Sequence, residues 1–211
     1  MQKNITAIIA NGEILKKNLV ERALQNVKTI IAADAGAETC KEAGITPNFI
    51  IGDCDSISHE LIDTFSEVEL IHLTDQYSTD MEKAINLALS MNPDGIRIIS
   101  ALGKRMDHTF ANLLFFSDLN KKAPVEIFDN YGIMRILESG LHNIDNKSGQ
   151  LISFFSPKPV ANLSLTGFRY PLKNENFDSC FVGISNVCDS DKCSVQFDSG
   201  TLFMYEVLND N

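Results

Sequence analysis

The chain has 211 residues, 44% of them apolar, and a formal net charge of −10. That length and composition can bury a sizeable core in one large or two small domains. The negative charge argues against general nucleic-acid binding, which requires a basic surface. No run of 18 uncharged apolar residues is present, so we expect no membrane-spanning helix.

Strands and helices alternate over the first part of the chain. Short apolar runs predict strands at residues 5–10, 29–33, 49–51, 69–73, 96–101 and 125–129. Helical spacing of apolar residues predicts helices at 13–27, 37–43, 59–65, 81–91 and 107–119. This alternation is typical of βαβ units, so we expect a mostly parallel α/β sheet domain over residues 1–130.

The pattern changes after about Asn130. The segments that follow are short, lack a helical period and are bounded by Gly, Pro, Asn or Ser; they lie at 133–137, 151–156, 160–165, 193–197 and 202–207. Such segments favour a smaller all-β domain, sandwich-like or barrel-like, over residues 131–211.

The cysteines and the N-terminal apolar run indicate the cellular compartment of the protein. Five cysteines stand at irregular spacings, and the apolar run near the N-terminus is too short for a signal peptide. We therefore expect reduced thiols and a cytoplasmic location.

Two carboxylates follow the third predicted strand. Asp53 and Asp55 come directly after Gly52, where ligands bind in open α/β sheets. Two close carboxylates repel each other unless a cation compensates them, and Mg²⁺ prefers such hard oxygen ligands. The alternative is a solvated acidic loop whose side chains make turn hydrogen bonds or cap the next helix.

Three further polar clusters fall at the ends of predicted strands: Asp34-Ala-Gly36, the segment 75–80 and the segment 103–108. Loops at one edge of a parallel sheet line one crevice, so we expect these clusters to meet. Asp80 is either a third metal carboxylate or a residue that complements the helix dipole. Lys104 and Arg105 either hold phosphate or lie in a solvated loop, and His108 is a minor candidate.

The ordered set of motifs is more specific than any one of them. The set comprises Asp34-Ala-Gly-Ala37, Ile50-Ile-Gly-Asp-Cys-Asp-Ser56, Asp75-Gln-Tyr-Ser-Thr-Asp80, Arg105-Met-Asp-His-Thr109, Leu165-Thr-Gly-Phe-Arg-Tyr-Pro-Leu172 and Gly183-Ile-Ser-Asn186. Together these motifs resemble the thiamine pyrophosphokinase family. The resemblance implies an α/β domain followed by a β-sandwich that binds thiamine. It also implies pyrophosphoryl transfer from ATP to thiamine, with AMP as the second product, Mg²⁺ as cofactor, and a homodimer with sites at the subunit interface.

The resemblance also implies roles for single residues. Asp53, Asp55 and Asp80 match the metal acids, and with Asp107 they form the expected catalytic set. The ATP-binding set is Asp34, Gln76, Thr79, Lys104, Arg105 and His108. Tyr170, Ser185 and Asn186 match the thiamine contacts, and an aromatic wall in an acidic site suits the thiazolium cation. Asp107 could instead pair with Arg105 or accept the hydroxyl proton.

Two other functions stay open at this point. The Asp53-Cys-Asp55 pair could be the metal-binding motif of a nucleotide-sugar transferase, which would leave Tyr170 and Ser185 without a role. The same crevice could also belong to a non-catalytic sensor of a nucleotide or of thiamine.

Overall fold

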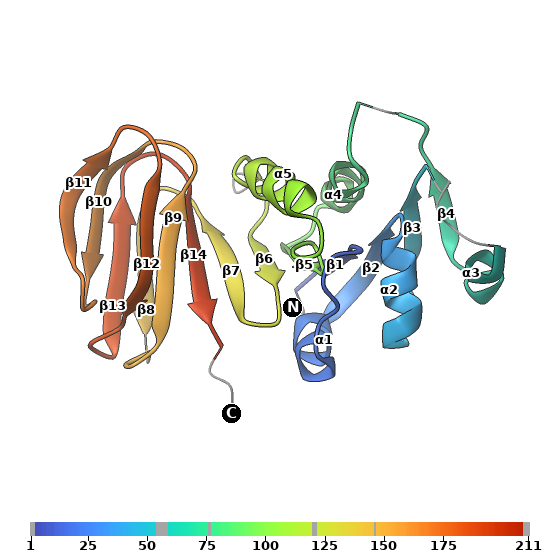
Figure 1. Cartoon of the computed structure of the whole chain (residues 1–211), viewed down its shortest axis with the longest axis horizontal. Coiled ribbons are helices and arrows are strands. Elements are labelled where there is room, and N and C mark those ends of the chain that lie inside the picture. Colours follow the sequence, from blue (N-terminus) through green and yellow to red (C-terminus); the bar gives the residue numbers. More distant parts are fainter. Residues whose placement is uncertain (1–2, 54–58, 76, 120–121, 146, 209–211) are drawn as a thin grey trace. The chain divides into compact units, whose positions relative to one another are not determined.

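The computed structural model describes residues 3–53, 59–75, 77–119, 122–145 and 147–208. The chain divides into two compact units (Figure 1). The first comprises Met1–Phe115 and Lys122–Asn130, and the second comprises Phe116–Lys121 and Tyr131–Asn211.

The first unit is built on a parallel sheet with strand order β6-β5-β1-β2-β3-β4. Its strands are β1 (Ile5–Ile9), β2 (Val27–Ala33), β3 (Phe49–Gly52), β4 (Glu69–His72), β5 (Gly95–Ile99) and β6 (Val125–Phe128). The central strand β1 is buried along its whole length, which explains its unbroken apolar sequence. The mostly parallel sheet predicted from the alternation of elements is confirmed.

The helices of the first unit are α1 (Lys17–Leu24), α2 (Gly36–Ala43), α3 (His59–Thr64), α4 (Asp80–Ser90) and α5 (Met106–Phe116). Helix α2 ends at Gly44, whose φ of 65° is the left-handed conformation that closes a helix and favours glycine. None of the described helices is long and apolar enough to cross a membrane.

The first helix begins four residues later than its apolar spacing predicts. The segment before Lys17 is held in a non-helical conformation because its backbone groups bond to distant parts of the chain. Glu13 N donates to Leu102 O at 2.8 Å, and the Asn130 amide donates to Ile14 O at 2.9 Å. Asn130 Oδ1 also accepts from Lys16 N at 2.8 Å. These long-range contacts override the local helical period.

The second unit is a pair of antiparallel sheets, ordered β12-β9-β14-β7 and β11-β10-β13-β8. Its strands are β7 (Gly132–Leu137), β8 (Gly140–Asp145), β9 (Leu151–Ser156), β10 (Val160–Thr166), β11 (Leu172–Phe177), β12 (Phe181–Val187), β13 (Lys192–Phe197) and β14 (Leu202–Val207). Residues from both sheets, among them Phe154, Leu163, Val195 and Phe197, form one buried core. The predicted all-β domain is therefore a sandwich, which is one of the two forms expected from the sequence.

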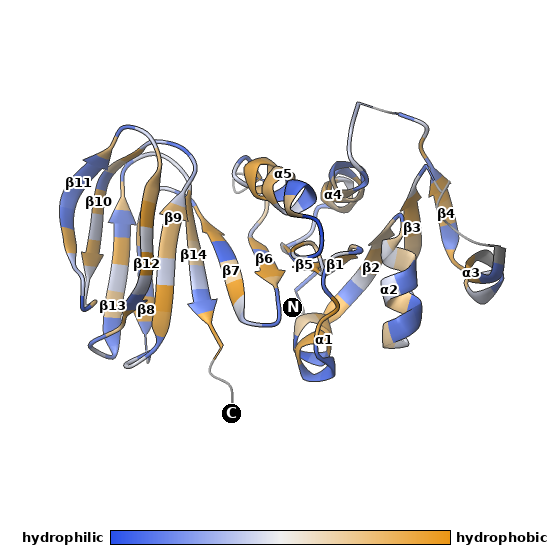
Figure 2. Ribbon diagram, in the orientation of Figure 1, coloured by the Kyte–Doolittle hydropathy of each residue, from blue (hydrophilic) through white to orange (hydrophobic). Residues whose placement is uncertain are grey.

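Three strands of the sandwich were not predicted, namely β8, β11 and β12. Strand β11 has the sequence LKNENF, and its four central residues are exposed. Figure 2 shows it as one of the most hydrophilic strands. A strand of this kind has no apolar face to give the alternation by which strands are recognised.

A buried carboxylate lies in the sandwich, on β14. The Glu206 side chain is 8% exposed and accepts from Arg135 Nη1 at 3.0 Å and from Lys147 Nζ. Burial acts to raise the pKa of Glu206, but the hydrogen bond from Lys147 and the charges of Lys147 and Arg135 outweigh it and lower the pKa.

We expect Glu206→Gln to flatten the acid side of the stability profile. A lowered pKa means that ionised Glu206 stabilises the fold above its unfolded-state pKa, and that this stabilisation is lost as the pH falls through the folded-state pKa. The unfolding temperature of the wild type should fall more steeply below about pH 4.3 than that of the variant. Circular dichroism melts across this range measure both, and parallel profiles would contradict the assignment.

Candidate active site

The strand order of the first unit changes direction at β1. From β1 the chain continues through β2 and β3 to β4 on one side, and β5 and β6 lie on the other. The point between β1 and β5 is therefore the topological switch point of the sheet, and ligands of open α/β sheets bind in the crevice at such a point. A cavity of about 750 Å³ lies here, with Asn11 and Gly12 from the end of β1 and Ser100 and Ala101 from the end of β5 in its wall.

Seven of the residues predicted from sequence line this cavity: Asp34, Thr79, Asp80, Lys104, Arg105, Asp107 and His108. They come from the loops after β2 and β5 and from the start of α4 and α5. The expected meeting of separate polar clusters in one crevice thus occurs for three of the four.

Asp34 is positioned by its own backbone and by a glycine on β3. Its φ of 44° is left-handed, and its backbone N donates to Ile51 O at 2.8 Å. A Cβ at Gly52 would lie 2.9 Å from the Cβ of Asp34. Only glycine at the end of β3 therefore lets the carboxylate occupy this place.

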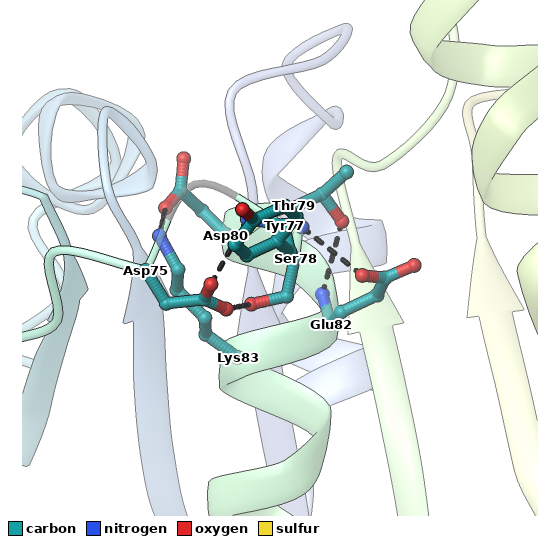
Figure 3. Close-up of polar contacts among 7 residues, drawn as sticks. All are labelled: Asp75, Tyr77, Ser78, Thr79, Asp80, Glu82 and Lys83. Carbon is teal, nitrogen blue, oxygen red and sulfur yellow. Dashed lines mark hydrogen bonds and ion pairs between the residues drawn. The ribbon is translucent and has the colours of Figure 1, made fainter.

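Figure 3 shows how the segment from Asp75 to Lys83 is tied together. Asp75 accepts hydrogen bonds from Ser78 Oγ and, at 2.9 Å, from Tyr77 N, and both lower the pKa of the Asp75 carboxyl. Thr79 caps α4: its Oγ1 accepts from Glu82 N at 3.2 Å, and Glu82 accepts from Thr79 N at 3.0 Å. The predicted helix start at this segment is confirmed.

Asp80 forms a partly buried ion pair that the sequence did not reveal. Lys83 Nζ lies 3.1 Å from Asp80 Oδ1, and the two side chains are 5% and 35% exposed. The ammonium group is buried in the first turn of α4, where the helix dipole is unfavourable to a cation. The carboxylate of Asp80 compensates both the burial and the dipole.

The loop after β5 carries the two cations of the cavity. Arg105 contacts Asp107 through Nε at 3.1 Å and Nη2 at 2.5 Å. The hydrogen bond from Arg105 is the main reason why the pKa of Asp107 is lowered to about 2. Lys104 Nζ donates to Asn11 Oδ1 at 3.0 Å, which joins this loop to the end of β1. Of the two roles open for Asp107, the structure contains the pairing with Arg105.

Two residues of α5 that were not predicted hold the same loop. Asn112 Nδ2 donates to Ala101 O at 2.9 Å, and Thr109 Oγ1 accepts from Gly103 N at 3.1 Å. Asn112, Asn11 and Ser100 are cavity residues that sequence reasoning missed. For Asn11 and Ser100 the usable signal was their position just after β1 and β5, but it required the strand order.

The predicted metal set is only partly described. Asp55 and Gln76 lie outside the described residues. Asp53 is half-buried and is not part of the cavity wall. Among the residues that the structure describes, no three His, Cys, Asp or Glu side chains are grouped closely enough to hold a metal ion. The set of Asp53, Asp55 and Asp80 therefore stays a prediction.

The predicted thiamine contacts lie in the second unit. Tyr170 is 64% exposed, whereas Asn186 is buried. Asn186 clamps the backbone of Tyr170: its Oδ1 accepts from Tyr170 N at 3.0 Å and its Nδ2 donates to Tyr170 O at 2.8 Å. Ser185 has a left-handed φ of 58° and donates through its backbone N to Ser153 Oγ at 3.0 Å. Asn186 thus fixes the backbone from which the exposed tyrosine projects.

Comparison with known proteins matches both units to one family. A family model described as "Thiamin pyrophosphokinase, catalytic domain" matches residues 20–128, and one described as "Thiamin pyrophosphokinase, vitamin B1 binding domain" matches residues 141–202. Thiamine pyrophosphokinase from Bacillus subtilis is 28% identical over 181 residues, which cover 82% of this chain and 85% of the relative.

Solved structures give the same result for the fold. The crystal structure of the Bacillus subtilis enzyme has a TM-score of 0.82 at 25% identity, covering 98% of this chain and 100% of that one. Thiamin pyrophosphokinase from Geobacillus thermodenitrificans has a TM-score of 0.79 at 27% identity, covering 98% and 99%.

Removing Asp80 and removing Lys83 from their ion pair should have unequal effects on the free energy of unfolding. Asp80→Asn removes the carboxylate paired with a buried ammonium group, leaves it only the weaker electrostatic interaction with exposed Asp75, and should lower the free energy of unfolding by about 2–4 kcal/mol. Lys83→Met leaves a carboxylate that is partly solvated and lies at a helix N-terminus, so its cost should stay below about 1 kcal/mol. The double variant should recover most of the loss, as measured by urea denaturation. Equal costs for the two single variants, with no recovery in the double variant, would contradict this account.

Proposed function

Because the chain belongs to the thiamin pyrophosphokinase family, we propose that it transfers the pyrophosphoryl group of ATP to the hydroxyl group of thiamine, with thiamine diphosphate and AMP as products. One structural observation carries the proposal. A single cavity at the switch point of the sheet combines the carboxylates of Asp34, Asp80 and Asp107 with the cations of Lys104 and Arg105.

Transfer of a pyrophosphoryl group requires positioning and charge neutralisation more than covalent help from the protein. In this proposal Lys104 and Arg105 bind phosphate oxygens, since both lie on the loop held by Asn112 and Thr109. Thr79 contributes a hydroxyl whose oxygen accepts from Glu82 N, so that its proton remains available to a ligand.

Mg²⁺ is the proposed metal. The chemistry of the proposed donors fits it, because Asp53, Asp55 and Asp80 carry carboxylate oxygens and Asp80 contacts Lys83 through Oδ1. When bound, the ion would supply charge neutralisation for the phosphates. Lys83 would keep Asp80 oriented toward the cavity through that contact.

Asp107 is better suited to hold Arg105 than to accept the hydroxyl proton of thiamine. A carboxyl group with a pKa of about 2 is ionised at working pH and binds a proton weakly. The bond from Arg105 that lowers this pKa also fixes the guanidinium within the loop. We therefore assign Asp107 an orienting role.

The second unit would bind the vitamin through Tyr170, Ser185 and Asn186. An exposed tyrosine ring can stack on a thiazolium cation, and Asn186 fixes the backbone on which Tyr170 sits. This assignment is supported by the match of residues 141–202 to the vitamin B1 binding domain model.

We further propose a cytoplasmic homodimer with sites at the subunit interface. Helix α5 exposes Met106, Phe110 and Leu114 at spacings of four residues, a stripe typical of interfaces. The described cysteines Cys40, Cys180, Cys188 and Cys193 are free thiols, which suits a reducing compartment. Neither the sugar-transferase nor the sensor alternative gains support from the comparisons.

The products distinguish this reaction from ordinary phosphoryl transfer. ATP incubated with the protein should yield AMP only when thiamine and Mg²⁺ are both present, with one thiamine diphosphate formed per AMP. Chromatography of the nucleotides measures this directly. ADP as the product would exclude pyrophosphoryl transfer, and binding without turnover under any divalent metal would favour the sensor alternative.

The proposed metal role of Asp80 is tested in the Lys83→Met variant, in which loss of the Asp80 carboxylate no longer leaves a buried ammonium group and so costs less stability. Adding Asp80→Asn to the Lys83→Met variant should lower turnover by roughly two orders of magnitude or more, since charge neutralisation at phosphate is worth several kcal/mol. Asp55→Asn should have a similar effect, whereas Asp63→Asn on the exposed surface of α3 is the matched control. Near-normal turnover with Asp80→Asn in the Lys83→Met background would rule out the role of Asp80.

A further inference from the structure

Ser100 is a cavity residue with an unsatisfied hydroxyl. It directly follows β5 and lines the switch-point cavity. The residue is only 2% exposed, and its Oγ has no hydrogen-bond partner in the part of the chain that the structure describes. A buried hydroxyl without a partner is destabilising, because it has lost its bonds to water.

The backbone of Ser100 adds a second cost. Its φ of 55° lies in the left-handed region, which is unfavourable for a residue with a Cβ. Glycine would adopt this conformation more easily, and alanine would carry no hydroxyl to leave unbonded. The residue present is therefore a poor choice for the fold alone, and strained, unsatisfied residues of this kind gather at ligand sites.

The position of Ser100 is fixed by its neighbours. Its carbonyl accepts from Gly12 N at 2.5 Å, which joins the ends of β5 and β1. The carbonyl of the next residue, Ala101, accepts from Asn112 Nδ2 at 2.9 Å. With bonds on both sides, the backbone of Ser100 is held in its left-handed conformation.

We propose that the Ser100 hydroxyl is a nucleotide-binding group that donates a hydrogen bond to an oxygen of bound ATP. The inference rests on the proposed function, and it adds a binding residue that the predicted site did not include. The acceptor is an oxygen of either the polyphosphate or the ribose, since both are hydrogen-bond acceptors that fit a donor at the end of a strand beside a switch point.

Two other buried hydroxyls provide a comparison within the same unit. Thr6 on β1 and Thr39 on α2 also lack a partner among the described residues, but neither lines the cavity. Of these three residues, only Ser100 belongs to the wall of the cavity. Thr6→Val, which removes a hydroxyl at nearly constant volume, is therefore a matched control for Ser100→Ala.

Calorimetry of the full chain with Mg²⁺ and α,β-methylene-ATP, which resists cleavage at the reacting bond, tests the proposal without turnover. Ser100→Ala should raise the Kd roughly three- to tenfold, the value of one neutral hydrogen bond. Its unfolding temperature should equal or exceed that of the wild type, because an unsatisfied hydroxyl has been removed. Thr6→Val should leave the Kd unchanged, and its unfolding temperature should likewise equal or exceed that of the wild type.

Two further ligands identify the acceptor. If Ser100 contacts the polyphosphate, Ser100→Ala should also weaken the binding of inorganic tripolyphosphate. If Ser100 contacts the ribose, the variant should weaken the binding of AMP but not that of tripolyphosphate. An unchanged Kd for α,β-methylene-ATP, or a lowered unfolding temperature for Ser100→Ala, overturns the proposal while the wild type still forms AMP. A wild type that binds no nucleotide would overturn the proposed function itself, and with it this inference.

Discussion

Parallel strands run outward in both directions from β1, and the candidate site depends on that arrangement. The cavity lies at this switch point, and the loops that follow β1, β2 and β5 line it together with the starts of α4 and α5. Close contacts hold this geometry: Gly12 N bonds to Ser100 O, and Lys104 bonds to Asn11. Loops held together in this way bring charged side chains from segments far apart in the sequence to one cavity.

Charge compensation is the second requirement of such a site in a chain with a net charge of −10. The protein pairs its acids with local cations, Asp80 with buried Lys83 and Asp107 with Arg105. Pairs of this kind allow carboxylates to lie close together without strong mutual repulsion. They also leave room for a metal ion and a polyphosphate to complete the balance, which explains how an acidic protein could bind an anionic substrate.

The sequence predicted the elements and much of the candidate site, but not what depends on long-range pairing. Apolar runs located every strand of the parallel sheet, and the helical spacing of apolar residues located α4. No periodic signal in the sequence indicates the order of the strands, the late start of α1 next to Asn130, or the polar strand β11. Burial of Lys83 and the unsatisfied hydroxyl of Ser100 follow from packing, so that composition and spacing could not reveal them.

We infer that the switch-point cavity holds the nucleotide and its metal. A crystal grown with Mn²⁺ and α,β-methylene-ATP tests it most directly, because the anomalous signal of the metal locates the ion independently of any assumption. We expect an anomalous peak beside a carboxylate oxygen of Asp80, with the nucleotide in the cavity between Asp34 and Arg105. A well-ordered nucleotide and metal bound elsewhere would contradict it.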